Sequence, residues 1–192
     1  MEEKELKNLF EKNMALLSGH FKLSSGFHSD TYFQSALILQ HPKEAARLAW
    51  ALAKKIKEHN IIVDVVASPA LGGVVIGHEV ARAFDVRAIF LERIDEKMSL
   101  RRGFSVNKGE KILVVEDVIT TGLSTREVIN SLKLFDVEIV AIASLVDRSA
   151  EKIDFGIPKF SLLSLNIKNY KAQECPMCKK GNNIVVKPGS RK

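Results

Sequence analysis

Two adjacent carboxylates, Glu116 and Asp117, follow an apolar run and lead into the hydroxyl-rich turn Thr120–Ser124. A helical pattern begins directly after the turn, with Val128 and Ile129 on its apolar face. Free backbone N–H groups and the helix dipole make such a turn a site for an anion. Because two carboxylates would repel a phosphate, we infer that they bind ribose hydroxyls or a metal carried by the ligand. The segment therefore predicts a site for a sugar phosphate.

A simpler interpretation of the same residues is a buried strand followed by an ordinary capped helix. Ser124 and Glu127 have the spacing of a capping box, in which the two side chains bond the first N–H groups of the helix. Capping and phosphate binding can coexist at one helix start, so this interpretation does not exclude the sugar-phosphate site.

The composition suits one globular domain with a small appendage, since the chain has 192 residues and is 46% hydrophobic. No apolar stretch approaches the roughly 20 residues of a membrane helix, and the Met-Glu-Glu-Lys-Glu start is not a signal peptide. We therefore expect a soluble cytoplasmic protein without a membrane partner. The net charge of +6 suits phosphorylated ligands. The basic C-terminal run is interpreted as a solvated tail, and nucleic-acid contact is the less favoured alternative.

The only two cysteines, Cys175 and Cys178, form a single CxxC motif. One CxxC supplies half of a tetrahedral zinc site, but no second CxxC and no nearby histidine completes it. Three interpretations stay open: reduced and inert thiols, which we favour, a site shared across a dimer, and a local disulfide. No protein side chain is therefore predicted to be a metal ligand.

Strands alternate with helices along the chain, and the strands are continuously apolar. This order predicts a parallel sheet covered on both faces. Ligands of such sheets bind beyond the carboxyl ends of the strands. Strands are expected over 61–67, 86–91, 112–115, 137–146 and 160–165, and helices over 3–17, from Pro42, from Gly73 to about Phe84, and over 124–135. Residues 92–110 are predicted to form a long exposed loop or hairpin.

The segment Ile112–Ser124 closely resembles the phosphoribosyl pyrophosphate signature of the type I phosphoribosyltransferases. Three further segments resemble the orotate phosphoribosyltransferases: Leu23–Phe33 their N-terminal hood, Ser68–Gly73 their pyrophosphate loop, and Leu145–Arg148 the strand end that meets orotate. The resemblance implies an α/β fold, a parallel sheet flanked by helices, with a small N-terminal hood. It implies a single domain over 1–192, with hood elements from about 1–40 and a basic CxxC-containing tail from about 171–192.

The resemblance also implies which residues act. Lys97, Glu116 and Asp117 are the implied catalytic residues. The implied phosphoribosyl pyrophosphate ligands are Gly72, Gly73, Arg93, Lys97, Glu116, Asp117, Val118, Ile119, Thr120, Thr121, Gly122, Leu123 and Ser124. The implied orotate ligands are Ser25, Gly26, Thr120 and Arg148. A guanidinium can bind a carboxylate with two parallel hydrogen bonds, so Arg148 suits an acidic base. Arg148 could instead form a surface ion pair with Asp147 or Glu151.

The implied reaction joins orotate to phosphoribosyl pyrophosphate, with Mg²⁺ bound mainly through the substrate diphosphate. The resemblance further implies a homodimer with shared active sites, in which Lys97 crosses to the partner. Four positions where the family often has cations carry Ser24, Gly72, Ile94 and Ser99 here, and Arg101 and Arg102 could replace the missing charge. Two alternatives stay open: transfer to a purine base, and a regulator that senses phosphoribosyl pyrophosphate.

Overall fold

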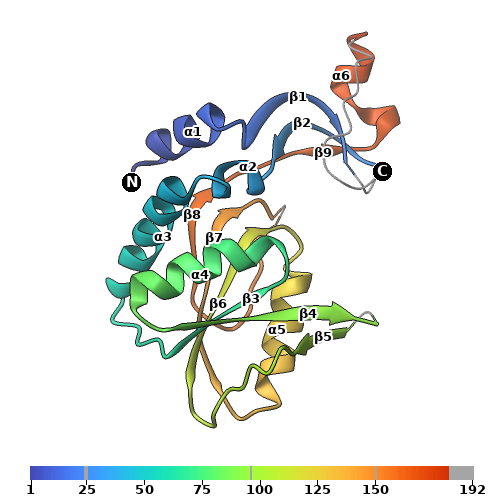
Figure 1. Ribbon diagram of the computed structural model, residues 1–192. Coiled ribbons are helices and arrows are strands. Elements are labelled where there is room, and N and C mark those ends of the chain that lie inside the picture. Colours follow the sequence, from blue (N-terminus) through green and yellow to red (C-terminus); the bar gives the residue numbers. More distant parts are fainter. Residues whose placement is uncertain (24–25, 96, 150, 182–192) are drawn as a thin grey trace. The chain divides into compact units, whose positions relative to one another are not determined.

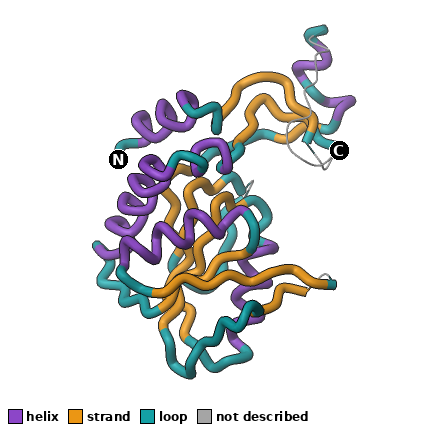
Figure 2. Tube along the Cα trace, in the orientation of Figure 1, coloured by secondary structure: helices purple, strands orange, loops and turns teal. Residues whose placement is uncertain are grey.

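The computed structural model describes residues 1–23, 26–95, 97–149 and 151–181, which fall into two compact units (Figures 1 and 2). The first unit joins residues 1–38 to the C-terminal segment that starts at Asn166. The second unit spans Leu39–Leu165. Among the described residues, no helix is long and apolar enough to cross a membrane.

The second unit is built on a six-stranded sheet in the order β5-β4-β3-β6-β7-β8 (Figure 1). Neighbouring strands run parallel, except that β5 is antiparallel to β4. The strands are β3 (Val65–Pro69), β4 (Arg87–Ile94), β5 (Lys97–Leu100), β6 (Lys111–Ile119), β7 (Glu138–Asp147) and β8 (Lys159–Ser164). The predicted fold class, a mainly parallel sheet flanked by helices, is confirmed.

Helices cover both faces of this sheet. They are α3 (Pro42–Lys57), α4 (Gly72–Phe84) and α5 (Leu123–Lys133). On one face, Val65 and Ala67 share a buried core with Val128 of α5. Strand alternation turns Ser68 to the opposite face, where α4 lies. There Gly77 of α4 comes so close that a Cβ atom on it would lie 1.9 Å from Ser68 Oγ, so the helix can pack only with glycine at this position.

Several predicted boundaries were wrong. The helix predicted over 3–17 ends at Lys12, because Met14 has a φ of 57° and β1 begins at Leu16. The strand predicted over 61–67 starts only at Val65, and Ile62 is 62% exposed despite its apolar side chain. The strand predicted to end at residue 115 continues to Ile119, because the ladder with β7 persists to that residue. The acidic pair therefore lies within a strand.

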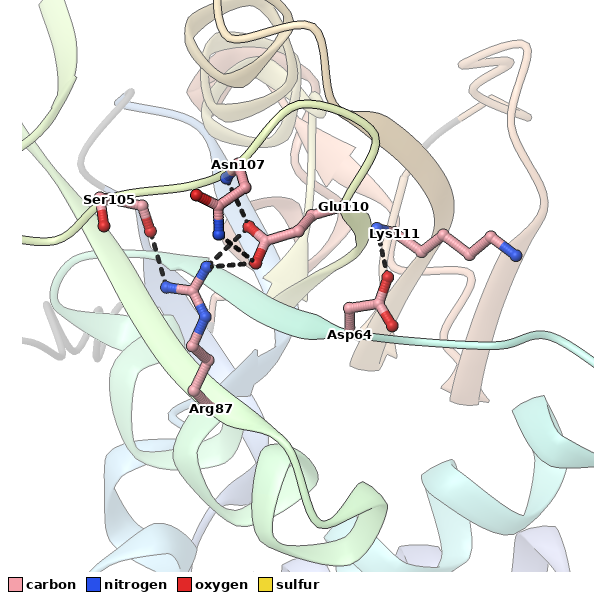
Figure 3. Close-up of polar contacts among 6 residues, drawn as sticks. All are labelled: Asp64, Arg87, Ser105, Asn107, Glu110 and Lys111. Atoms are coloured by element: carbon pink, nitrogen blue, oxygen red, sulfur yellow. Dashed lines mark hydrogen bonds and ion pairs between the residues drawn. The ribbon is translucent and has the colours of Figure 1, made fainter.

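Residues 92–110, predicted as one long exposed loop or hairpin, divide into a β4–β5 hairpin and a return segment. The return segment is held at the amino ends of the strands by polar contacts (Figure 3). Arg87 donates to the Ser105 carbonyl at 2.6 Å and to both oxygens of Glu110 at 2.7 and 2.8 Å. The Asn107 backbone N–H also donates to Glu110, at 2.7 Å. Phe104 packs against the core, so only the hairpin projects beyond the sheet (Figure 1).

The first unit contains a three-stranded antiparallel sheet in the order β1-β2-β9. The Phe10 and Phe33 rings meet edge to face in its core, with centroids 5.0 Å apart. The remaining elements are α1 (Glu3–Lys12), β1 (Leu16–Lys22), β2 (His28–Phe33), α2 (Ala36–Leu39), β9 (Asn169–Tyr170), the 3-10 helix η1 (Ala172–Glu174) and α6 (Pro176–Lys179). The short helix α2 spans the boundary between the two units.

Candidate active site

Asp117 of β6 lies directly against the start of α4. A Cβ atom on Gly72 would meet Asp117 Oδ1 at 2.7 Å, and one on Gly73 would lie 3.0 Å from the Val115 carbonyl oxygen. The nearest neighbour of Gly73 is a backbone atom, which moves aside less easily than the end of a flexible side chain. A side chain at Gly72 would displace the Asp117 carboxylate, and one at Gly73 would press on the backbone of β6. The structure thus brings the predicted glycine pair and the predicted acidic pair together, although they are far apart in the sequence.

Glu116 is buried, with 8% of its surface exposed, and sits beside Asp117. The Asp117 backbone N–H donates to Glu116 Oε1 at 3.2 Å. The pKa of Glu116 is raised to about 9. Burial is the largest cause, and the hydrogen bond to the Asp117 carboxylate and the repulsion from its charge add to it. Without a ligand at neutral pH, Glu116 therefore keeps its proton. Groups that bring O–H donors or positive charge, such as a ribose diol or a cation, would favour its ionised form.

The turn after β6 forms the start of α5. Its N-cap residue is Gly122, whose φ of 73° lies in the left-handed region, and a Cβ there would meet the Phe155 ring at 2.8 Å. The Arg126 N–H donates to the Gly122 carbonyl at 2.9 Å, whereas the N–H groups before it have no carbonyl acceptor within the helix. Glu116 and every residue from Val118 to Thr125 line a small hollow. This is the geometry of an anion site beside a carboxyl pair.

The capping-box interpretation of Ser124 and Glu127 was wrong. The N-cap of α5 is Gly122, two residues before Ser124, and no side-chain cap bond is present there. Glu127 instead forms an ion pair with Arg93 at the end of β4. The packing of α5 on the sheet brings these two residues together, which the spacing of Ser124 and Glu127 along the sequence does not indicate.

Arg148 follows β7 on the same edge of the sheet. Its backbone N–H donates to the Ile119 carbonyl at 2.9 Å, so it stands beside the end of β6. Asp147, one alternative partner for Arg148, accepts bonds from Lys159 Nζ at 2.5 Å and Ser149 Oγ at 2.6 Å. Burial opposes ionisation of Asp147, but these bonds outweigh it and lower its pKa. Lys159 and Ser149 therefore hold the Asp147 carboxylate.

Comparisons with known proteins agree with this geometry. A sequence model of the phosphoribosyl transferase domain matches residues 35–177. The orotate phosphoribosyltransferase of Caldanaerobacter subterraneus subsp. tengcongensis is 50% identical over 192 residues, which cover 100% of both chains. The chain belongs to the orotate phosphoribosyltransferase family. The family member of Caldicellulosiruptor saccharolyticus is 52% identical over 96% of this chain and 95% of its own.

A solved structure of the same family has a similar fold. The Mycobacterium tuberculosis H37Rv orotate phosphoribosyltransferase in complex with inorganic phosphate matches with a TM-score of 0.66 and 25% identity. The match covers 84% of this chain and 94% of that chain. The resemblance that the motifs predicted is therefore confirmed at the level of the family and of the fold.

In this orotate phosphoribosyltransferase family member, the cations of the β4–β5 hairpin divide into two groups. Arg102 is bound to Glu92, with Nε–Oε2 and Nη2–Oε1 distances of 2.7 and 2.8 Å. Lys97 is exposed and lines a surface hollow together with Arg101. Arg101, one of the two arginines suggested to replace missing family cations, shares this hollow with Lys97. The assignment of Lys97 to catalysis stays a prediction.

Two predicted orotate ligands belong to the first unit. Gly26, with a φ of 84°, forms the turn between β1 and β2, where its N–H donates to the Leu23 carbonyl at 2.9 Å. Ser25 and Ser24 lie outside the described residues. The roles of Gly26 and Ser25 stay predictions.

Sequence reasoning missed three features. The Phe155 ring packs against Gly122, and the guanidinium carbon of Arg126 lies 4.8 Å from the centre of the same ring. Glu127 is the partner of Arg93. The prediction that no histidine lies near the CxxC motif was wrong, because folding brings His20 and His28 to Cys175 and Cys178. Both cysteines are free, so the local disulfide is not formed. No local pattern signals contacts between residues so far apart in the chain.

Proposed function

We propose that this chain transfers the phosphoribosyl group of 5-phosphoribosyl 1-pyrophosphate to orotate, giving orotidine 5′-phosphate and pyrophosphate. Relatives about half identical over the whole length bear the name orotate phosphoribosyltransferase. The observation that carries the proposal is the contact of the Asp117 carboxylate with Gly72, next to buried Glu116 and the start of α5. One edge of the sheet thus offers groups for a ribose, a phosphate and a diphosphate side by side.

The acidic pair would hold the sugar. Ribose hydroxyls donate hydrogen bonds to carboxylate oxygens, and two adjacent carboxyls suit a pair of neighbouring hydroxyls. Orotate reacts as its ring anion, whose nitrogen has already released its proton to solvent. When this nitrogen attacks C1, the bond from C1 to the diphosphate oxygen breaks, and the leaving oxygen takes the electron pair. Positive charge develops on the sugar during this step. A carboxylate fixed at Asp117 stabilises that charge without reorganising, which is the general basis of electrostatic catalysis.

The two glycine-containing turns would hold the phosphates. The first N–H groups of α5 and the positive end of its dipole favour the 5-phosphate. The backbone at Gly72 and Gly73 carries no side chain, so a diphosphate can approach it closely. Arg93 lies at the end of the adjacent strand and is oriented by Glu127. We assign the positive charge that meets pyrophosphate to Arg93 and Lys97.

Magnesium belongs to the proposal as a companion of the diphosphate. The residues fit it, because the carboxylate oxygens of Asp117 adjoin the loop assigned to the diphosphate, and Mg²⁺ prefers oxygen ligands. When bound, the ion neutralises charge on the leaving pyrophosphate. Asp117 would help to hold the ion, while substrate oxygens and water would supply most of its ligands.

Base selection and assembly complete the proposal. Arg148, beside the end of β6, would bind the orotate carboxylate through two parallel hydrogen bonds. The protein would act as a homodimer in which Lys97 of each β4–β5 hairpin serves the partner's active site. The exposed position of Lys97 on this projecting hairpin supports such an exchange.

The decisive experiment follows the absorbance of orotate after phosphoribosyl pyrophosphate and Mg²⁺ are added. We expect orotate to be consumed and pyrophosphate to be released in equal amounts. Adenine, hypoxanthine and uracil serve as competing bases, and none should be converted at a comparable rate. Turnover of a purine in place of orotate, or binding of phosphoribosyl pyrophosphate without any turnover, would contradict the proposal.

A further inference from the structure

Four side chains of the first unit direct potential metal ligands toward one point. They are His20 on β1, His28 at the start of β2, and Cys175 and Cys178 at the start of α6. Their donor atoms all lie within 4.8 Å of one another. His20 Nε2 lies 2.9 Å from His28 Nδ1, and Cys178 Sγ lies 3.3 Å from the same His28 nitrogen. The distances from His20 Nε2 to the sulfurs of Cys175 and Cys178 are 3.5 and 3.6 Å.

Three of these separations match a tetrahedral zinc site. Zinc binds cysteine sulfur at about 2.3 Å and histidine nitrogen at about 2.0–2.1 Å, so neighbouring ligands of a tetrahedron lie about 3.3–3.8 Å apart. The three nitrogen–sulfur distances fall within or at the edge of this range. The distance of 2.9 Å between the two histidine nitrogens is shorter than this range, and the two imidazole rings would move slightly apart to admit the ion.

Hydrogen bonding alone does not account for the arrangement. A ring nitrogen of histidine either carries one proton or accepts one hydrogen bond in the ring plane. His20 Nε2 nevertheless has three polar neighbours within 3.6 Å, and it can satisfy only one of them. A disulfide would remove both sulfurs from the cluster, but the cysteines are free. A cation at the centre would satisfy all four groups at once.

Burial and charge favour the same ion. Cys175 is fully buried, and His20 and His28 are only 4% and 6% exposed. Two thiolates and one Zn²⁺ sum to zero charge, so the occupied cluster can be buried without an unpaired charge. A tetrahedral set of two sulfurs and two nitrogens selects zinc over magnesium or calcium, which prefer oxygen. Because all four ligands come from the protein, the site is closed and its role is structural.

The local fold explains how these ligands are presented. The β1–β2 ladder shifts register between Ser18 and Phe21, so β1 carries one extra residue in a bulge that contains His20. At the other side of the cluster, Cys175 is the N-cap of α6. The helix turn then closes at Gly181, whose φ is 75° and whose N–H donates to the Cys178 carbonyl at 3.0 Å. A bulge and a helix start therefore position the two halves of the site.

We propose that His20, His28, Cys175 and Cys178 bind one structural zinc ion, which ties the β1–β2 hairpin to the C-terminal CxxC segment. All four ligands belong to the first unit, whereas the acidic pair and the phosphate-binding turns belong to the second. The ion is therefore distinct from the magnesium that accompanies the diphosphate. The cluster lies within one chain, so the site does not need a second subunit, in contrast to the shared site considered from the sequence.

The test measures metal content in the full-length chain purified from zinc-supplemented medium and dialysed. We expect about one zinc per chain by mass spectrometry. Cys175→Ser and His28→Asn should each reduce the bound zinc at least tenfold, an order-of-magnitude estimate for loss of one of four ligands. His78→Asn is the matched control, because His78 is exposed on α4, and it should leave the zinc content unchanged.

A second measurement needs no substitution. The wild-type chain is stripped with a chelator and titrated with Co²⁺, whose visible bands distinguish tetrahedral sulfur ligation from octahedral oxygen ligation. We expect intense tetrahedral bands that saturate at one equivalent and disappear when Zn²⁺ is added. Octahedral bands only, a wild-type chain without zinc, or full zinc retention by Cys175→Ser would each overturn the proposal. Neither readout depends on turnover, so a failed activity assay would leave this test intact.

Discussion

Replacing Glu116 with glutamine should stabilise the unliganded protein, and the gain should increase with pH. Burial and the adjacent Asp117 raise the pKa of Glu116 to about 9 in the folded state, against an ordinary value of 4.5. The folded state therefore holds a proton that the unfolded chain releases. The stability that depends on this proton is fully present below pH 4.5 and is lost as pH rises toward about 9. Glutamine has the shape of the protonated carboxyl and carries no titrating group.

The expected size follows from one proton of difference between the two states. In that window the free energy of unfolding of the wild type falls by about 1.4 kcal/mol per pH unit relative to the variant. From about pH 6 to about pH 8 the advantage of Glu116→Gln should therefore grow by up to about 3 kcal/mol. If the pKa of Glu116 in the folded state is below about 9, the pH range over which the stability difference grows ends at that lower pH.

Urea unfolding at several pH values measures this difference. The single tryptophan, Trp50, is 54% exposed in the folded state, so circular dichroism of the helices is the better measure of unfolding. Glu58→Gln, at the exposed end of α3, is the matched control for the same chemical change on the surface. A difference between Glu116→Gln and wild type that stays constant from pH 6 to pH 8 would refute the argument that buried Glu116 is protonated.

Three further predictions concern catalysis. Gly72→Ala should reduce turnover about a hundredfold, because the new Cβ would lie 2.7 Å from Asp117 Oδ1 and would displace the carboxylate. Steady-state kinetics measure the loss, and an unchanged circular dichroism spectrum shows that the fold is kept. Arg148→Ala should raise KM for orotate about tenfold to a hundredfold, because a charge-assisted hydrogen bond worth roughly 1.5–3 kcal/mol is lost. An equal rise in KM for both substrates would mean that Arg148 has a structural role. Mixing inactive Lys97→Ala chains with inactive Asp117→Asn chains should restore activity. In each mixed dimer one of the two shared active sites has neither substitution, so a mixed dimer should reach up to about half the activity of a wild-type dimer. No recovery after proven subunit exchange would exclude a crossing lysine.

The strand–turn–helix unit of the candidate sugar-phosphate site could be predicted from the sequence because its residues are contiguous. Glu116, Asp117 and the turn to Ser124 form one strand–turn–helix unit, and the periodicity of the flanking apolar residues predicts that order. The alternation of apolar strands with helices likewise predicted the parallel sheet. Both depend on interactions between neighbours in the chain, which local residue types largely determine.

Only the tertiary structure decided how distant residues meet. The sheet order β3-β6 places Gly72 against Asp117, and the packing of α5 on the sheet places Glu127 against Arg93. The raised pKa of Glu116 depends on its burial by surrounding elements, which residue type alone cannot predict. His20 and Cys175 meet although 155 positions separate them. A CxxC motif viewed along the sequence lacks its histidines, because the free energy that brings them together comes from packing of the whole first unit.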